Sequence, residues 1–301
     1  MGKFLEGKAV AITGSGRGIG RAIALACAAE GAKVVVNDYG VSMDGQEPTS
    51  EIANEVVDEI KSAGGEAVAN ANSVATMEGG ASIVQSAIDN FGRIDGVVCV
   101  AGILRERMLF NMTEEDWDPV VETHLKGHFT VFKAASAVMR KQKSGSLIGF
   151  TSGAFAGSVA QANYASAKGG IVSLVRSAAV GLYKYGVTSN CIAPVAKTRM
   201  SANVPMTIAG MGEAEDVAPM AVYLMSDKAR HITGQVYTVT GGKIAVWNQP
   251  QELRSMMKEG RWTPEEIAER IDGGVGIEKM GMIDRLEAMA KAAASGEKPN
   301  A

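Results

Sequence analysis

Short runs of β-branched apolar residues alternate along the chain with longer stretches in which apolar residues recur every three or four positions. The short runs predict strands over residues 9–13, 33–37, 67–70, 96–100, 146–150, 187–192 and 235–239. The longer stretches predict helices over residues 19–30, 51–62, 77–91, 113–141 and 163–184. Each crossover between parallel strands must return the chain over the sheet. The pattern therefore predicts an α/β fold with a doubly wound, seven-stranded parallel sheet.

The alternation stops near residue 246. Residues 1–246 form one predicted domain, and residues 247–301 form a polar, strand-poor extension that we expect to be helical. Thr263-Pro264-Glu265-Glu266 is a strong helix start. A later apolar stripe (Met280, Met282, Ile283, Leu286 and Met289) favours packing against the domain or another subunit, with substrate binding as the alternative.

Size and charge limit the classes of partner. The chain has 301 residues and a net charge of -3, which gives no reason to expect nucleic acid or an anionic membrane surface. Small-molecule chemistry is favoured. Neither a signal peptide nor a membrane-spanning apolar stretch is found, so we expect a cytoplasmic protein. Cys27, Cys99 and Cys191 lie in apolar segments, which predicts buried free thiols and no metal site.

A glycine-rich turn, Thr13-Gly14-Ser15-Gly16-Arg17-Gly18-Ile19-Gly20, joins the first strand to the first helix. Backbone amides at such a helix start can bind a pyrophosphate, and glycine allows the close approach. The spacing departs from the general Gly-x-Gly-x-x-Gly pattern, because Ile19 occupies the place of the last glycine. We predict dinucleotide binding by Gly14, Gly16, Arg17, Gly18, Ile19 and Gly20, against the alternative of a purely structural turn.

Asp38 at the end of the second strand indicates which dinucleotide is bound. A carboxylate there would accept hydrogen bonds from a ribose diol and repel a 2′-phosphate, which favours NAD over NADP. Arg17 argues the other way, because a guanidinium could reach a 2′-phosphate or simply the pyrophosphate. Asn72, Ser73 and Val74 follow the third strand and are candidate adenine neighbours by position only.

Tyr164 and Lys168 are four residues apart in a predicted helix, so their side chains point the same way. Lowering a phenol from a pKa near ~10 towards neutrality needs roughly 4 kcal/mol. A cation at about 4 Å, at an effective dielectric constant near 20, would supply about that amount. The Lys168 amine could thus lower the pKa of Tyr164, with a positively charged nicotinamide adding to the effect, and make it a base for hydride chemistry. For the pair taken alone, the alternative is an ordinary exposed helix face.

Taken together, these motifs resemble the short-chain dehydrogenase/reductase family, which has the Rossmann fold, over about residues 5 to 246. Further matches are Ala101-Gly102, Pro194 with Thr198, Thr233-Gly234-Gln235 and Gly241-Gly242. The resemblance implies that Tyr164 transfers the proton and Lys168 binds the nicotinamide ribose. It also implies that Ala101, Gly102, Pro194 and Thr198 lie beside the cofactor, and that the protein is a homotetramer built on the helices that begin at Thr113 and Asn163.

Several stretches look closest to one branch, the (3R)-hydroxyacyl-CoA dehydrogenase module of peroxisomal multifunctional enzyme type 2 and its single-domain bacterial relatives. They are Val35-Val36-Asn37-Asp38, Ala67-Val68-Ala69-Asn70, Gly102-Ile103-Leu104-Arg105 and Gln161-Ala162-Asn163-Tyr164. His124 matches this branch at a position where most of the family has asparagine. The resemblance assigns it to a proton relay, with a structural histidine as the alternative.

Three departures from the family pattern affect the site. The family places its substrate-binding serine thirteen residues before the tyrosine, where this chain has Thr151. Ser152 is twelve residues before, and we prefer it because loops absorb deletions more easily than strand ends do. Cys99-Val100 replaces the usual asparagines before Ala101-Gly102, which makes cofactor affinity less certain. Pro194-Val195 replaces the common Pro-Gly and should stiffen the turn.

The sequence thus predicts an NAD-dependent oxidoreductase with Ser152, Tyr164, Lys168 and His124 as catalytic residues. The resemblance suggests a (3R)-3-hydroxyacyl-CoA or a bulky hydrophobic secondary alcohol such as a hydroxysteroid as substrate. The alternatives are an NADPH-dependent 3-oxoacyl reductase and a non-catalytic dinucleotide-binding regulator.

Overall fold

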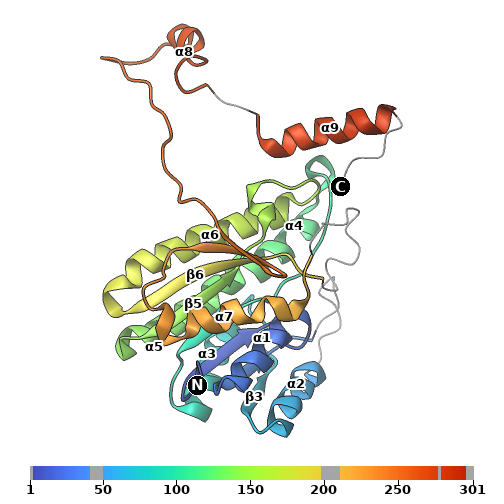
Figure 1. Ribbon diagram of the computed structural model, residues 1–301, viewed down its shortest axis with the longest axis vertical. Helices are drawn as coiled ribbons and strands as arrows, with labels where there is room; N and C mark the ends of the chain where they lie inside the picture. The colour runs from blue at the N-terminus through green and yellow to red at the C-terminus, as the bar shows by residue number, and fades with distance from the viewer. Residues whose placement is uncertain (1–2, 41–49, 198–210, 277–278, 296–301) are drawn as a thin grey trace. The chain divides into compact units, whose positions relative to one another are not determined.

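The computed structural model describes residues 3–40, 50–197, 211–276 and 279–295 (Figure 1). The chain divides into two compact units, Met1–Trp247 and Asn248–Ala301. The first unit contains the sheet and every residue predicted to take part in catalysis or cofactor binding. One of the predicted cofactor-binding residues, Thr198, lies outside the described residues.

The first unit is built on an eight-stranded sheet in the order β3-β2-β1-β4-β5-β6-β7-β8. The strands are β1 (Ala9–Thr13), β2 (Lys33–Asn37), β3 (Glu66–Asn70), β4 (Gly96–Cys99), β5 (Gly145–Phe150), β6 (Val187–Pro194), β7 (Val236–Thr240) and β8 (Lys243–Val246). All neighbours pair in parallel except β7 and β8. The predicted doubly wound α/β fold is confirmed.

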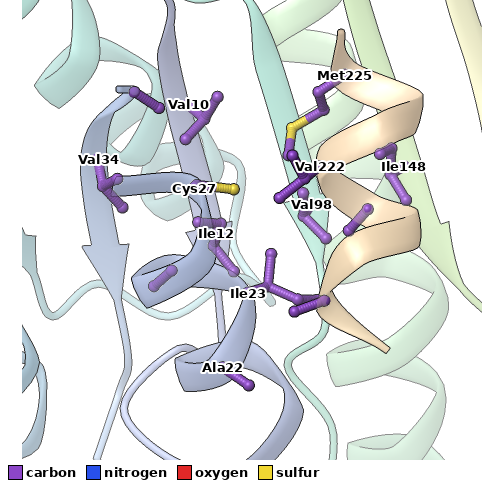
Figure 2. Packing of buried hydrophobic residues seen from close by; sticks show 14 of the residues in the cluster. Val10, Ile12, Ala22, Ile23, Cys27, Val34, Val98, Ile148, Val222 and Met225 are labelled. Atoms are coloured by element: carbon purple, nitrogen blue, oxygen red, sulfur yellow. The ribbon is translucent and has the colours of Figure 1, made fainter. Parts of the chain in front are cut away.

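Helices cover both faces of the sheet. One core cluster lies under α1 (Gly18–Ala29), α2 (Glu51–Ser62) and α7 (Ala218–Met225). Figure 2 shows part of it, where Ile23 of α1 and Val222 and Met225 of α7 meet Ile12 and Val98 of the sheet. The other cluster lies under α3 (Met77–Phe91), α5 (Gly127–Gln142) and α6 (Ala162–Leu182). Strands buried from both sides explain why the sequence shows continuous apolar runs in place of alternation.

β8 was not predicted from the sequence. It turns back at Gly241, which has a φ of 49°, and pairs antiparallel with β7. Only four residues long, with Ile244 and Val246 largely exposed, it carries no run of buried apolar residues. An exposed edge strand lacks the buried apolar run by which the other seven strands were predicted.

The predicted long helix over residues 113–141 is interrupted. It consists of α4 (Glu114–Val121), a π-helical turn named η2 (Glu122–Lys126) and α5. A Thr113 capping box starts it as expected. Single π turns inside α-helices occur often at functional sites, and this one carries His124.

The remaining elements are short 3-10 turns and the helices of the second unit. They are the 3-10 turns η1 (Leu109–Asn111), η3 (Gly153–Ala156), η4 (Tyr183–Tyr185), η5 (Ala214–Asp216) and η6 (Asp227–Ala229), and in the second unit the helices α8 (Pro264–Arg270) and α9 (Gly281–Ser295). α8 starts at the predicted capping box of Thr263 and Glu266. The partner of the apolar stripe on α9 stays a prediction. Among the described residues, no helix has the length and apolar character needed to cross a membrane.

Candidate active site

The predicted site residues lie at the carboxyl ends of the parallel strands. The strand order reverses between β1 and β4, because the chain winds outward from β1 in one direction and from β4 in the other. Ligands of doubly wound sheets bind at such a switch point, outside the carboxyl ends of the strands. The glycine turn follows β1 and Ala101 follows β4, on the two sides of this switch point, and Ser152 follows the next strand, β5.

The glycine turn is shaped by close approaches that exclude side chains. Gly14 has a φ of 63°, and a Cβ there would lie 2.7 Å from the Ala101 nitrogen. A Cβ at Gly16 would clash with Ile52 and lie 2.8 Å from Asp38 Oδ2, and one at Gly20 would run into the carbonyl of Gly14. Only glycine therefore fits at these three positions, and we call this closely packed turn the glycine cradle.

The start of α1 is left open to a ligand. α1 begins at Gly18, the Arg17 side chain makes no capping hydrogen bond, and no acidic residue stands in the first turn. Arg17 and Gly18 are exposed, and Ile19 is half-buried. An uncapped helix start beside a glycine cradle fits the pyrophosphate of a dinucleotide.

Asp38 lies against this turn. Its Oδ2 accepts a hydrogen bond from the Gly16 amide at 2.8 Å, and its Oδ1 accepts one from Gly40 at 2.8 Å. The carboxylate is thus fixed at the end of β2, next to the cradle, where a ribose diol would be recognised.

The candidate adenine neighbours point in different directions. The Asn72 amide donates to Ser82 Oγ in α3, and Ser73 Oγ accepts from the Ala75 amide. Val74 is buried against Gly127, where a Cβ would lie 2.7 Å from the Val74 side chain. The polar side chains of Asn72 and Ser73 are therefore engaged locally.

Thr13 supports the backbone that lacks the family's asparagines. Its Oγ1 accepts hydrogen bonds from the amides of Val100 at 3.1 Å and Ala101 at 3.2 Å. The segment before Ala101-Gly102 is thus tied to β1. These two hydrogen bonds hold the backbone that the family's asparagine side chains would otherwise hold.

Tyr164 and Lys168 face one another on α6. The Lys168 Nζ lies 5.3 Å from the centroid of the Tyr164 ring. The amine is buried and donates to the carbonyl oxygen of Phe150 at 2.6 Å. Burial lowers the pKa of Lys168 to about 7. The amine therefore gives up its proton far more readily than an exposed lysine does.

The structure contradicts the pKa expected for Tyr164. Burial raises the pKa of the phenol above its ordinary value, and a hydrogen bond with Ser152 opposes this effect. The sequence analysis assumed a fully charged amine about 4 Å away. Instead the ammonium is partly neutralised by its own burial and bonds to a backbone carbonyl.

Ser152 and Thr151 have different surroundings. Ser152 hydrogen-bonds to Tyr164, and its Oγ also accepts from the Ala154 amide. Thr151 is buried and donates its hydroxyl hydrogen to the carbonyl oxygen of Lys168 at 2.8 Å. Ser152 therefore lies at the phenol, whereas Thr151 fastens the helix behind it.

His124 is also brought to the phenol. Its ring meets the Tyr164 ring edge-on, with the centroids 5.1 Å apart. Its Nε2 lies 2.8 Å from the carbonyl oxygen of Ile103 and 3.3 Å from the amide nitrogen of the same residue, and the shorter contact favours a hydrogen on Nε2. Its buried Nδ1 has no hydrogen-bond partner among the described residues. Burial lowers the pKa of His124 well below its ordinary value, and the positive charge of Lys168 adds to the effect. The ring is a neutral imidazole with a free acceptor nitrogen.

Gly102 makes room for this imidazole. A Cβ at Gly102 would clash with His124 Cε1 and lie 2.9 Å from Nδ1. The cofactor-side backbone of Ala101-Gly102 and the histidine thus pack directly against each other.

Two residues of this region were missed in the sequence analysis. Asn163 is fully buried and donates to the carbonyls of Arg105 and Asp116, which fixes the start of α6 next to Tyr164. His128 is buried between α5 and β5. Its spacing of four residues from His124 was the available signal.

The remaining predictions lie at the edge of the site. Pro194 ends β6, and Val195 continues by hydrogen bonding to Val239. The three cysteines are free and buried, as predicted. Burial raises the pKa of each thiol, that of Cys191 to about 12.

The chain matches a family model described as enoyl-(acyl carrier protein) reductase over residues 14–243. That match spans most of the chain, from the glycine turn to the first residue of β8. The chain belongs to the short-chain dehydrogenase/reductase family. It is therefore an oxidoreductase of a family that uses a nicotinamide dinucleotide, as the sequence predicted.

Relatives of known name extend this result. The chain is 38% identical to a hydroxyacyl-CoA dehydrogenase of Mycobacterium tuberculosis, covering 87% of each chain. It is 39% identical to peroxisomal multifunctional enzyme type 2 of Mus musculus over 87% of its own length, and it spans 36% of that longer protein. The predicted resemblance to this branch is confirmed.

A solved structure agrees with the fold. A short chain dehydrogenase from Mycobacterium avium is 44% identical, with a TM-score of 0.83, and covers 92% of this chain and 97% of its own. The similarity includes more than the first unit.

Proposed function

We propose that this protein is an NAD-dependent dehydrogenase that oxidises a secondary alcohol with Tyr164 as the base. One observation carries the proposal: the Tyr164 phenol is hydrogen-bonded to Ser152 and flanked by His124 and Lys168 within a buried site. A phenol with these neighbours can hold the substrate oxygen and exchange its proton.

Each side chain has a separate role in this proposal. Ser152 orients the substrate oxygen, and Tyr164 takes the hydroxyl proton. Lys168 holds the nicotinamide ribose and stabilises the phenolate with its positive charge. The free Nδ1 of His124 accepts a hydrogen bond in the path that carries the proton outwards.

The cofactor fits the described residues. The glycine cradle and the open start of α1 would hold the pyrophosphate, and Asp38 would hold the adenine ribose. The bound nicotinamide supplies the hydride acceptor and, in its oxidised form, a positive charge. That charge would oppose the effect of burial on the pKa of Tyr164.

We propose a 3-hydroxyacyl-CoA as the substrate, with a hydroxysteroid-like alcohol as the second choice. The similarity to a hydroxyacyl-CoA dehydrogenase supports the first. The alternative is an NADPH-dependent 3-oxoacyl reductase, which the 37% identity to a 3-oxoacyl-[acyl-carrier-protein] reductase of Staphylococcus aureus supports. A homotetramer and a cytoplasmic location stay predictions.

The proposal is tested by NADH formation from a panel of 3-hydroxyacyl-CoA esters, hydroxysteroids and aromatic alcohols. We expect turnover of at least one class, and Tyr164→Phe should reduce kcat by roughly 1,000-fold because the ring stays but the proton acceptor is lost. Tyr183→Phe, which changes a largely exposed tyrosine, is the matched control. Full activity in Tyr164→Phe would refute the role of the phenol, and no turnover with any alcohol or ketone would favour the regulator.

Cofactor choice is tested separately by titrating NAD and NADP. We expect NAD to be preferred, and Asp38→Ala should weaken NAD at least tenfold and reduce the discrimination, because the carboxylate both binds the diol and repels a 2′-phosphate. A tenfold preference of the unaltered protein for NADPH would instead establish the reductase alternative.

A further inference from the structure

His128 joins two parts of the active site that are distant in sequence. It is buried on α5, one turn after His124. Its Nδ1 lies 2.6 Å from the carbonyl oxygen of His124, and its Nε2 lies 3.1 Å from the amide nitrogen of Phe150 at the end of β5. An amide can only donate, so Nε2 is the unprotonated acceptor and Nδ1 carries the hydrogen.

The chain of contacts continues to the amine of Lys168. The amide of Phe150 is held by His128, and the carbonyl of the same residue accepts the hydrogen bond of Lys168 Nζ at 2.6 Å. The two peptide groups that flank the Phe150 Cα are therefore both fixed, one by an imidazole and the other by an ammonium.

The register of the sheet explains why an imidazole is needed there. β4 ends at Cys99, which lies opposite Gly149, whereas β5 continues to Phe150. The described contact of the Phe150 amide is with the histidine ring, at the point where the neighbouring strand has stopped. A buried amide that lost this acceptor would be left unpaired or would have to turn.

We propose that His128 is a positioning residue of the active site: as a neutral imidazole it fixes the Phe150 carbonyl that holds the Lys168 amine beside Tyr164. This inference rests on the proposed function for its kinetic consequence, but the structural link between His128 and Lys168 does not. Among the described residues, the Phe150 carbonyl is the hydrogen-bond acceptor of the Lys168 amine, so this carbonyl determines where the positive charge lies.

The ring stays neutral over the working pH range. Burial and the charge of Lys168 lower the pKa of His128 to about 3, which outweighs the carbonyls of His124 and Cys99. The titratable groups around the two linked residues are Tyr164 and Lys168 from α6, His124 from η2, Cys99 from β4 and Cys191 from β6. The thiols stay protonated, His124 stays neutral and burial raises the pKa of Tyr164, so Lys168 is the group in this set that titrates near neutrality.

Loss of the link has a predictable sign. Without a fixed Phe150 carbonyl the ammonium loses its acceptor, so the amine gives up its proton at a lower pH. A less charged amine stabilises the phenolate less, and the acidic limb of the rate profile for alcohol oxidation should move to a higher pH.

The test compares three substitutions of one residue. His128→Asn can still donate to the His124 carbonyl but is too short to reach Phe150. His128→Gln places an amide oxygen near the position of Nε2 and can accept from Phe150. His128→Leu removes both bonds at similar volume. Thr188→Val is the control, because it removes a buried hydrogen bond to Ser146 at the opposite end of the strands.

Two readouts are followed in full-length protein whose fold is verified by circular dichroism. One is the pH profile of kcat for the alcohol found active. The other is a ¹³C NMR titration of the labelled Lys168 side chain, assigned with Lys168→Met, which needs neither cofactor nor turnover. We expect His128→Asn to lower kcat at pH 7 roughly tenfold, to move the acidic limb up by about one unit and to lower the Lys168 titration point. His128→Gln and Thr188→Val should behave like the unaltered protein.

If His128→Asn leaves the Lys168 titration point and the acidic limb unchanged, the positioning role is refuted. If the unaltered protein oxidises no alcohol, the proposed function is refuted. The NMR titration still tests whether His128 affects the pKa of Lys168. Should His128→Leu fail to fold, the comparison of Asn with Gln is sufficient, since both introduce an amide and differ only in reach.

Discussion

Lys168 shows how far a single residue departs from its ordinary chemistry in this fold. Its side chain is buried, and burial lowers its pKa to about 7. The sequence predicted that the amine would share a helix face with Tyr164, and the structure places both on the same side of α6. The spacing did not reveal that the amine would be stripped of water and bonded to the carbonyl of Phe150.

This burial makes stability depend on pH. Between about pH 7 and the ordinary lysine value of 10.5, the unfolded chain binds a proton at Lys168 that the folded chain does not. The contribution of this residue to the free energy of unfolding therefore rises with pH across that window. Below pH 7 both states are protonated and the full cost of burying the charge is present.

Lys168→Met removes that cost. We expect the variant to gain stability relative to the unaltered protein at pH 6, by at most about 5 kcal/mol, and the gain to shrink as the pH rises from 7 towards 10. Urea unfolding at pH 6 and pH 9 measures the difference. The lost hydrogen bond to Phe150 lowers the stability gain equally at pH 6 and pH 9. The test is therefore the change in this gain between the two pH values. Lys133→Met, an exposed lysine of α5, should show no such change. A stability difference between Lys168→Met and the unaltered protein that stays constant with pH would contradict a lowered pKa of Lys168 in the folded state.

At the scale of elements, the π turn η2 and the edge strand β8 each place a side chain next to the candidate active site. The π turn interrupts the run from α4 to α5 and brings His124 against the Tyr164 ring. β8 ends beside Trp247, whose ring packs on Phe155 with the centroids 4.5 Å apart and whose Nε1 donates to Thr238 Oγ1. Phe155 belongs to η3, the turn that follows Ser152.

Trp247 therefore supports the segment that carries the substrate-orienting serine. Trp247→Ala should destabilise the protein by about 2 kcal/mol, because a half-buried aromatic ring and one hydrogen bond are lost, and should raise KM for the alcohol several-fold. Trp247→Phe keeps an aromatic ring but loses the hydrogen bond to Thr238, so its stability and its KM should lie between those of Trp247→Ala and the unaltered protein. Urea midpoints and initial-rate kinetics measure both effects. If Trp247→Ala lowers the urea midpoint but leaves KM unchanged, the indole stabilises the hairpin without positioning Ser152.

At the scale of the whole molecule, the two units differ in how they are held together. Both core clusters draw their buried residues from the first unit, and each lies between the sheet and one layer of helices. Because all parallel strands end at one edge, residues distant in the sequence meet there, such as Gly14 and Ala101. The second unit contributes exposed apolar side chains on α9, among them Met282 and Leu286.

The sequence by itself determined the central architecture and the identity of most site residues. Strands buried on both faces need continuous apolar runs, so β1 and β2 could be predicted to the residue, and glycines at a strand end are required wherever backbone must approach backbone. Both requirements are local, so they can be predicted from short stretches of the sequence.

Tertiary structure alone decided what these residues do to each other. Whether Ser152 or Thr151 reached the phenol depended on the loop after β5, and the edge strand β8 depended on a partner that only the folded sheet provides. The pKa values of Tyr164 and Lys168 follow from burial by elements distant in the chain, as does the contact of His128 with Phe150. Desolvation and hydrogen bonding between strands are non-local, so no spacing along the chain encodes them.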